Sequence, residues 1–208
     1  MFVERGWFIP TLQFGPDDVF LVEDWEDTPV GPYRAIFHFI PEDYRTLYVS
    51  GEAGRDLVSG IHRFDHRVVT SIASHRADGR WFIEADTGEK GELRIEVEYG
   101  ENLPLRMVNR IAPRIPDGVA RNPLYCRLLP RLSAPLLGTD PGQRIAGVTE
   151  MGRRSRFRLH RVYRVTRARC TWGGRDLGPL CECLYQHDMG DFRPTSRAVV
   201  SYLELYVD

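Results

Sequence analysis

Short apolar runs separated by glycine and proline constrain the fold of this chain more than any other feature. The clearest run, 92–99, alternates apolar and charged residues, as expected for a strand with one buried face. Other runs rich in β-branched and aromatic residues occupy 18–25, 34–40, 47–50, 67–74, 81–85, 156–172, 180–187 and 197–207. This many strands at short spacing predict an all-β or β-rich α+β fold, in an antiparallel barrel or sandwich.

Residues 101–143 depart from this pattern. Proline occurs seven times in the segment, and proline in a helix interior removes a hydrogen bond and clashes with the preceding turn. We therefore expect an irregular excursion with short pieces of helix, of the kind that forms lids or walls of sites. No linker divides the 208 residues, so we expect a single domain over 1–208.

Composition bears mainly on partners and location. The formal net charge is −1, which gives no overall reason to expect nucleic acid or an anionic membrane as partner. No apolar run approaches the ~20 residues of a membrane helix, and the N-terminus lacks a signal-peptide pattern, so we expect a cytoplasmic protein. Nine arginines lie within 153–175, either as a surface for phosphates or, more simply, as a solvated strand face paired with carboxylates.

The sequence contains no pattern for a cofactor or metal, and we expect none. Lys90 is the only lysine and lies in a predicted solvated turn, which argues against Schiff-base catalysis. The four cysteines lack zinc-site spacing, and no nucleotide-binding loop or nucleophile elbow is present. His62 and His66 have the spacing of a helical metal pair, but the glycine and valines around them favour loop and strand.

The stretch 48–67 places many ionisable groups next to three glycines, and we expect any chemistry here. Histidines and carboxylates supply an acid and a base near neutral pH, while arginines hold a substrate carboxylate by paired hydrogen bonds. The simpler alternative is a polar turn in which Asp65 and Arg67 pair structurally. The predicted catalytic residues are Glu52, His62, Arg63, Asp65 and His66, and the predicted substrate-binding residues are Tyr33, Arg34 and Arg55.

Two segments of this region resemble a known family. Residues 25–33 read WEDTPVGPY and residues 47–63 read LYVSGEAGRDLVSGIHR. Together they resemble the acetoacetate decarboxylase-like superfamily, over roughly residues 20–75, about a quarter of the chain. The resemblance implies a closed antiparallel barrel with a buried pocket, in a homo-oligomer. The family's Schiff-base lysine is replaced by Arg63, the proline before it by His62 and a nearby glutamate by Ala35, whereas Glu52 matches.

These features lead to three functional hypotheses. The first is a cofactor-independent lyase, cyclase or isomerase of biosynthesis. It would act on a small oxo-acid or polyketide-like substrate through acid/base and arginine-anchoring chemistry. The second is a non-catalytic barrel that binds a small apolar or acidic ligand. The third is an interaction module that uses the arginine-rich strand.

Overall fold

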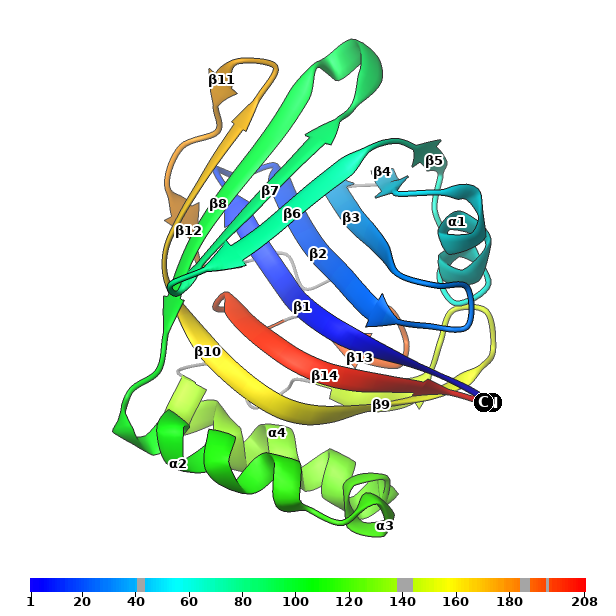
Figure 1. The fold of residues 1–208 in the computed structure, drawn as a ribbon, viewed down its shortest axis with the longest axis vertical. Coiled ribbons are helices and arrows are strands. Elements are labelled where there is room, and N and C mark those ends of the chain that lie inside the picture. Colours follow the sequence, from blue (N-terminus) through cyan, green and yellow to red (C-terminus); the bar gives the residue numbers. More distant parts are fainter. Residues whose placement is uncertain (41–43, 138–143, 184–187, 194) are drawn as a thin grey trace.

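A strongly curled sheet forms most of the molecule (Figure 1). The computed structural model describes the chain except residues 41–43, 138–143, 184–187 and 194. The path of the sheet follows the order β5-β4-β3-β2-β1-β14-β10-β8-β7-β6. Its strands are β1 (Phe2–Phe14), β2 (Asp18–Asp27), β3 (Tyr33–Ile40), β4 (Tyr44–Val49), β5 (His66–Val69), β6 (Ile72–Ala77), β7 (Arg80–Asp86), β8 (Glu92–Gly100), β10 (Arg154–Trp172) and β14 (Val199–Val207). Shorter strands pair beside this path: β9 (Arg144–Val148), β11 (Arg175–Asp176), β12 (Leu180–Cys181) and β13 (Phe192–Arg193).

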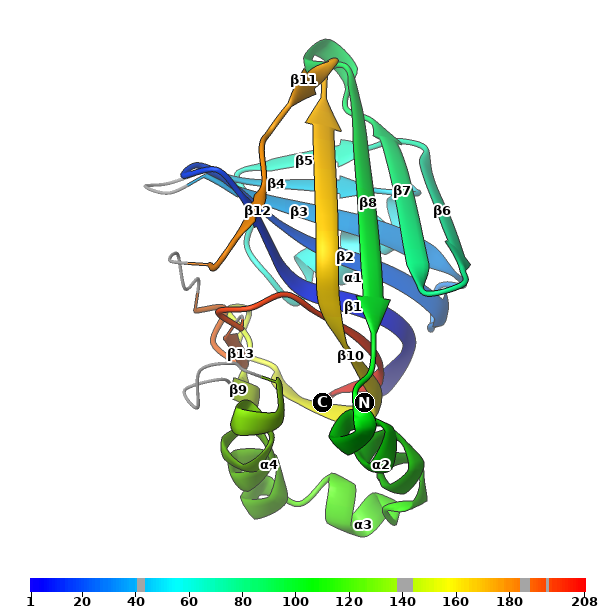
Figure 2. The same ribbon diagram turned by 90° about the vertical axis from the view of Figure 1, so that its left-hand side faces the viewer.

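The predicted β-rich, mainly antiparallel fold is confirmed, but the predicted closure of the barrel is wrong. β5 and β6 form the two ends of the path, and no pairing joins them in the described part of the chain. β5 has only four residues and pairs in parallel with β4, after which the chain turns directly into β6. Arg34 of β3 donates from Nη1 to the carbonyl of Ile72 in β6 at 3.3 Å, so this bond crosses between strands that do not pair. The result is a half-barrel, shown in two views 90° apart in Figures 1 and 2.

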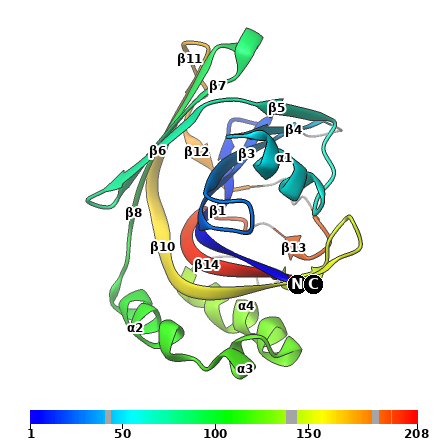
Figure 3. The same ribbon diagram turned by 45° about the vertical axis from the view of Figure 1, so that its right-hand side comes forward.

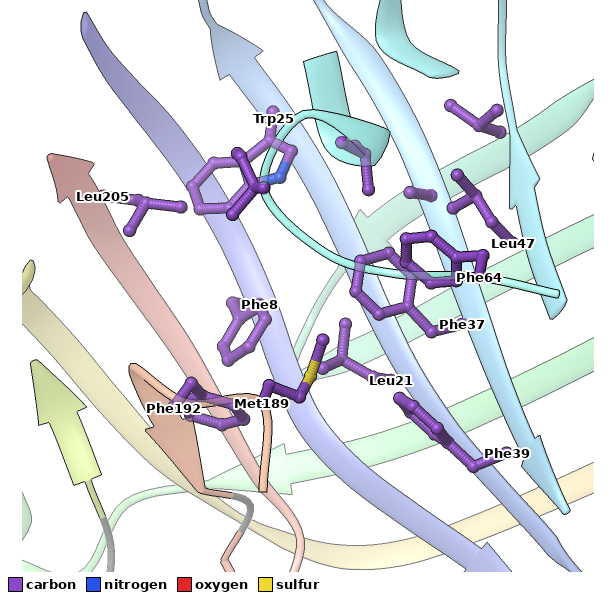
Figure 4. Packing of buried hydrophobic residues seen from close by; sticks show 14 of the residues in the cluster. Phe8, Leu21, Trp25, Phe37, Phe39, Leu47, Phe64, Met189, Phe192 and Leu205 are labelled. Carbon is purple, nitrogen blue, oxygen red and sulfur yellow. The ribbon is translucent and has the colours of Figure 1, made fainter. Parts of the chain in front are cut away.

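The sheet buries both of its faces around β1–β4. Alternation along β2 sends Phe20 and Val22 to one face, and Leu21, Glu23 and Trp25 to the other. The first face packs inside the curl against β6, β7, β8 and β10. The second face is covered by residues that follow β4 and by the 189–192 segment, as Figure 4 shows. Two apolar cores therefore lie on opposite sides of the same strands.

One helix lies where the sequence predicted a glycine-rich loop. Helix α1 (Glu52–Ser59) runs through Gly54, although glycine is a poor helix former. The reason is packing, since an added Cβ at Gly54 would lie only 3.0 Å from the Tyr33 ring. Gly51 precedes the helix with φ of 108°, a conformation that favours glycine. Gly54 thus allows α1 to pack closely on β3, and Gly51 allows the chain to turn into the helix.

The proline-rich segment is more helical than predicted. It contains α2 (Leu103–Ile111), a 3₁₀ turn η2 (Ala112–Arg114), α3 (Asp117–Ala120) and α4 (Pro123–Leu137). α4 spans 15 residues and includes Pro130 and Pro135 in its interior, contrary to the expectation of short pieces. Tertiary packing compensates for the lost hydrogen bonds, because Cys126, Pro130 and Ala134 are buried along one side of α4. No helix in the described residues has the length and apolar character needed to cross a membrane.

Arginines of β10 attach these helices to the sheet. Arg158 donates from Nη1 to Asp117 at 2.6 Å and from Nη2 to the Ile115 carbonyl at 3.1 Å. Arg164 donates to the Leu136 carbonyl at 2.7 Å. Helices α2, α3 and α4 consequently gather at one end of the molecule (Figure 3). For these arginines the structure supports the simpler of the two interpretations, pairing within the fold.

Candidate functional site

Most of the predicted residues of 48–67 diverge in the structure. Glu52 and Arg55 lie on the solvent side of α1, where they pair with each other at 2.9 Å. Arg63 is exposed, and its backbone N–H donates to Glu150 Oε2 at 3.0 Å. His66 is also exposed and stacks on the Tyr44 ring at 4.8 Å. The arginine at the position of the family's lysine is therefore a surface side chain.

Asp65 has a structural contact. Its Oδ2 accepts the backbone N–H of Arg45 at 2.9 Å, while its own N–H donates to the Arg45 carbonyl at 2.9 Å. Asp65 thereby extends the pairing of the chain with β4. Arg67 does not form the expected pair with Asp65, and instead donates to the hydroxyl of Ser59 at 3.0 Å. The polar turn exists, but with other partners.

Tyr33 and Arg34 are neighbours in sequence but lie on opposite faces of β3. Arg34 Nε lies 3.2 Å from Asp24 Oδ1 and is partly exposed. Tyr33 is buried, and its hydroxyl donates to Glu4 Oε1 at 2.7 Å. Of the eight predicted residues, Tyr33 and His62 are the two that lie buried in the described structure.

Three carboxyl groups that the sequence analysis missed lie on the buried face with Tyr33. They are Glu4 and Asp191, each 0 % exposed, and Glu23, 7 % exposed. Glu23 stands beside Phe8 of β1 and Ala35 of β3, so strand register fixes its direction. Figure 4 shows the aromatic surroundings, with Phe192 from the segment of Asp191 lying over Phe8. Their rings are 5.3 Å apart, edge to face.

Burial raises the pKa of all three carboxyls. Desolvation raises the pKa of Glu4 to about 7, against the hydrogen bond from Tyr33 that lowers it. Desolvation, followed by the nearby charge of Glu4, raises the pKa of Glu23 to about 8, and Asp191 adds to this effect. Burial raises the pKa of Asp191 to about 6, opposed by the hydrogen bond from Ser155. No cation among the described residues acts on the pKa of Glu4 or Glu23.

Two polar atoms of this group lack a hydrogen-bond partner. They are Glu4 Oε2 and Asp191 Oδ1. Buried polar atoms in folded proteins almost always have partners, and exceptions concentrate where a ligand or water binds. The two atoms therefore mark a place where a polar group of a small molecule would be stabilised.

His62 lies near this group but in a different environment. Its Nδ1 is 3.8 Å from Glu150 Oε2, and its ring packs edge-on against Phe37. Burial lowers the pKa of His62 to about 4, although the Glu150 carboxylate acts in the opposite direction. Arg45 pairs with the same carboxylate at 2.5 Å. At neutral pH the imidazole is uncharged, and its unpartnered Nδ1 is a second candidate for proton transfer.

An apolar cavity of about 60 Å³ begins one strand away from Glu23. Phe8 forms part of its wall and is the cross-strand neighbour of both Glu23 and Ser201. Side chains of β10, β14, β9, β13 and α4 contribute further lining, including Phe157, Phe192 and Leu203. The carboxyl group and the cavity thus share an aromatic wall.

Comparisons with known proteins agree on the fold alone. No protein-family model and no curated protein matches the chain. Its fold is similar to solved structures of acetoacetate decarboxylase. One, from Legionella pneumophila subsp. pneumophila str. Philadelphia 1, is 9% identical with a TM-score of 0.46, over 98% of this chain and 82% of that chain. Another, described as structural studies of acetoacetate decarboxylase, is 10% identical with a TM-score of 0.49, over 100% of this chain and 88% of that chain.

The signals for the buried carboxyls were present in part. Glu4 and Glu23 lie in strand runs with many apolar residues, FVERGWF and DVFLVEDW, and Glu23 lies on the same face of its strand as Leu21 and Trp25. Asp191 precedes a two-residue strand and carries no such signal. In the described residues, no three His, Cys, Asp or Glu side chains are arranged to hold a metal ion.

Proposed function

We propose that the chain is an enzyme that moves a proton on a small carbonyl compound, using the buried carboxyls Glu4, Glu23 and Asp191. The observation that carries this proposal is the burial of three carboxyl groups on one face of the sheet, with no cation among the described residues acting on Glu4 or Glu23. This burial raises their pKa values to about 7, 8 and 6, which suits proton exchange near neutral pH. Because the groups interact, the values belong to the group as a whole.

The size of the pKa increase assigns the roles. Asp191 has the smallest increase of the three and acts as the general base. Glu23 has the largest increase, which favours its protonated form, and it donates a hydrogen bond to the substrate oxygen, which stabilises the enolate that forms when a proton leaves the adjacent carbon. Glu4, fixed by Tyr33, returns a proton or supports Glu23. Lyase, cyclase and isomerase reactions of oxo compounds all pass through such an enolate.

The site favours small, apolar substrates and excludes imine chemistry. A cavity of about 60 Å³ accommodates a few water molecules or a compound of a few non-hydrogen atoms. Within that limit, a small oxo compound fits better than one of polyketide size. Lys90, the only lysine, is exposed on a turn, so no lysine side chain is available to the buried carboxyls.

The test is deuterium exchange at the carbon next to a carbonyl. The protein is incubated in D₂O with small β-keto acids and 1,3-diketones, and ¹H NMR follows loss of the α-proton signal or loss of the substrate. We expect the wild type to accelerate exchange. Glu23→Gln should slow it by roughly 10²-fold or more, the usual contribution of a positioned proton-transfer group. Glu84→Gln, an exposed carboxylate of β7, is the matched control.

A third variant separates this site from the one predicted from sequence. Glu52→Gln changes the exposed carboxylate of α1. If activity falls in Glu52→Gln and survives in Glu23→Gln, the chemistry belongs to the outer residues and the buried site is wrong.

One observation favours a second candidate, a ligand-binding protein without turnover. The cavity wall is almost entirely aromatic and aliphatic, with hydroxyl groups only from Ser133, Thr195 and Ser201. Saturable binding of a diketone by calorimetry, with no exchange at any pH between 5 and 9, would select this alternative over catalysis.

A further inference from the structure

Helices α2 and α4 carry the same outward-facing pattern. Within each helix, aliphatic residues recur at intervals of four and arginines at intervals of four, three residues after the first aliphatic one. In α2 the pattern consists of Leu103, Met107 and Ile111 with Arg106 and Arg110. In α4 it consists of Leu124, Leu128 and Leu132 with Arg127 and Arg131. All ten side chains are exposed in the structure, and we call them the amphipathic face.

The exposure of the aliphatic members is unusual for a folded protein. Leu103 is 70 % exposed and Leu132 is 72 % exposed, while the inward positions Leu105 and Cys126 are buried. Each helix thus has a buried inner position and an apolar stripe whose members are between 43 % and 72 % exposed. Figures 1 and 2 place α2, α3 and α4 together at one end of the molecule, so the stripes belong to one end. Grouped exposed apolar residues of this kind mark interaction surfaces.

The positive charge of the helical segment indicates an anionic partner for this face. Residues 101–137 contain six arginines and two acidic residues, a formal charge of +4 in a chain whose net charge is −1. Both acidic residues are already occupied, Glu101 by Arg106 and Asp117 by Arg121 and Arg158. Arg110, Arg127 and Arg131 form no ion pair in the described part of the chain. The surface therefore presents apolar side chains flanked by unpaired positive charge.

A basic groove borders the same helix. It has a volume of about 360 Å³ and lies between the start of α4 and strands β9 and β10. Arg127, Arg154 and Arg156 line it, and Arg156 also pairs with Asp208 at 2.5 Å. Its size and charge suit an anionic headgroup beside a surface into which α4 inserts its leucines.

We propose that the amphipathic face docks on the surface of an anionic lipid bilayer. Aliphatic side chains would enter the headgroup region while the arginines contact lipid phosphates and carboxylates. A second copy of the chain is disfavoured, since pairing this face with itself would place unpaired arginines against each other. The net charge of the whole chain does not predict this surface, because the positive charge is concentrated in one segment.

Vesicle co-sedimentation tests the proposal with the full chain. We expect binding to vesicles of phosphatidylcholine mixed with phosphatidylserine, weak binding to phosphatidylcholine alone, and loss of binding at high ionic strength. Arg110→Gln with Arg131→Gln should lower partitioning roughly 30-fold, since each basic residue near an anionic surface contributes about fivefold. The matched control is Arg167→Gln with Arg169→Gln, the same charge change on exposed arginines of β10.

A second pair of variants tests the apolar contribution. Leu103→Ser with Leu132→Ser should also weaken binding, and folding should be preserved because both side chains are largely exposed. Equal binding to neutral and anionic vesicles, or equal losses in the test and control arginine pairs, would overturn the proposal. So would a dimer in analytical ultracentrifugation that the serine variants dissociate, which would assign the face to a second copy.

Discussion

Two buried carboxylates on neighbouring strands have opposite properties. Glu4 of β1 and Glu204 of β14 are 0 % and 3 % exposed, and Glu204 pairs in register with the residue that follows Glu4. Burial raises the pKa of Glu4 to about 7. At Glu204, hydrogen bonds from Tyr206 and Arg5 outweigh the opposing effect of burial and lower the pKa to about 2.

The difference comes from the face of the sheet that each residue occupies. Glu204 faces two arginines: Arg5 Nε of β1 donates to it at 2.9 Å, and Arg158, which also attaches the helices, approaches it at 3.4 Å. Glu4 faces the aromatic core and has one described partner, the Tyr33 hydroxyl. Placement of arginine thus separates a structural carboxylate, ionised and paired, from one able to exchange protons near neutral pH.

The largest expected effect on stability comes from removing an arginine that pairs with Glu204. Arg158→Ala leaves Glu204 and Asp117 without one of their cations and should lower the free energy of unfolding by about 2–3 kcal/mol. The loss stays below that of a fully broken buried pair because Arg5 remains. Urea denaturation measures it. Arg161→Ala, at an exposed position of β10, is the control and should change stability by less than about 0.5 kcal/mol.

A loss in Arg158→Ala no greater than in Arg161→Ala would mean that the ion pairs do not hold the helices. The double variant Arg158→Ala with Glu204→Gln should recover part of the loss, because the unpaired buried charge is removed along with its partner.

The buried carboxyls without a cation should make the protein less stable as pH rises, the opposite of the effect of a carboxyl whose pKa is lowered. The pKa of Glu23 is 4.5 when unfolded and about 8 when folded, so the folded state binds more protons between these values. Stability therefore falls as pH rises through this interval. The lowered pKa of His62 has the reverse effect between about 4 and 6.5, which leaves pH 6.5 to 8 as the window in which the carboxyls dominate.

Glu23→Gln should flatten this decline and raise the free energy of unfolding at pH 8 by about 1–3 kcal/mol, the typical penalty of an unsatisfied buried polar group. Thermal melts across pH 6.5–8 measure the slope. Glu84→Gln, at an exposed position, should keep the wild-type slope. A slope that is identical in Glu23→Gln would show that Glu23 does not ionise in this range.

Much of this architecture was predictable, and the misses have physical causes. The alternation of apolar and charged residues over 92–99 predicted β8 correctly, because one face of that strand is buried and the other is solvated. The helix through Gly54 was missed because its stability comes from contact with Tyr33, which local propensity does not record. Glu52 matches the family pattern and His66 belongs to the same ionisable stretch of sequence, but both side chains face solvent. Glu4 and Asp191 are 187 residues apart in sequence. They belong to one buried group only because the sheet and the segment that covers it bring them together, which local sequence patterns do not record.

A smaller effect is expected at the single described partner of Glu4. Tyr33→Phe removes the hydroxyl donor and should lower the free energy of unfolding by about 1 kcal/mol. Because that hydrogen bond lowers the pKa of Glu4, its loss should raise the pKa above the present value of about 7. Carboxyl ¹³C NMR of glutamate-labelled protein measures the titration. Tyr44→Phe, an exposed tyrosine, is the control, and an unchanged Glu4 titration in Tyr33→Phe would contradict the assignment.

The smallest effect is expected at Lys90, the only lysine, which is exposed on a turn. Its Nζ lies 5.0 Å from the centre of the ring of Trp172, a residue of the core on the other face of the sheet from the unpaired carboxyls. Lys90→Met should therefore cost only about 0.5 kcal/mol, as for an exposed cation–π contact. Borohydride reduction in the presence of a β-keto acid should give no adduct at this residue by mass spectrometry. A reduced adduct that disappears in Lys90→Met would place a reactive amine in the mechanism, and proton transfer by the carboxyls alone would no longer describe the site.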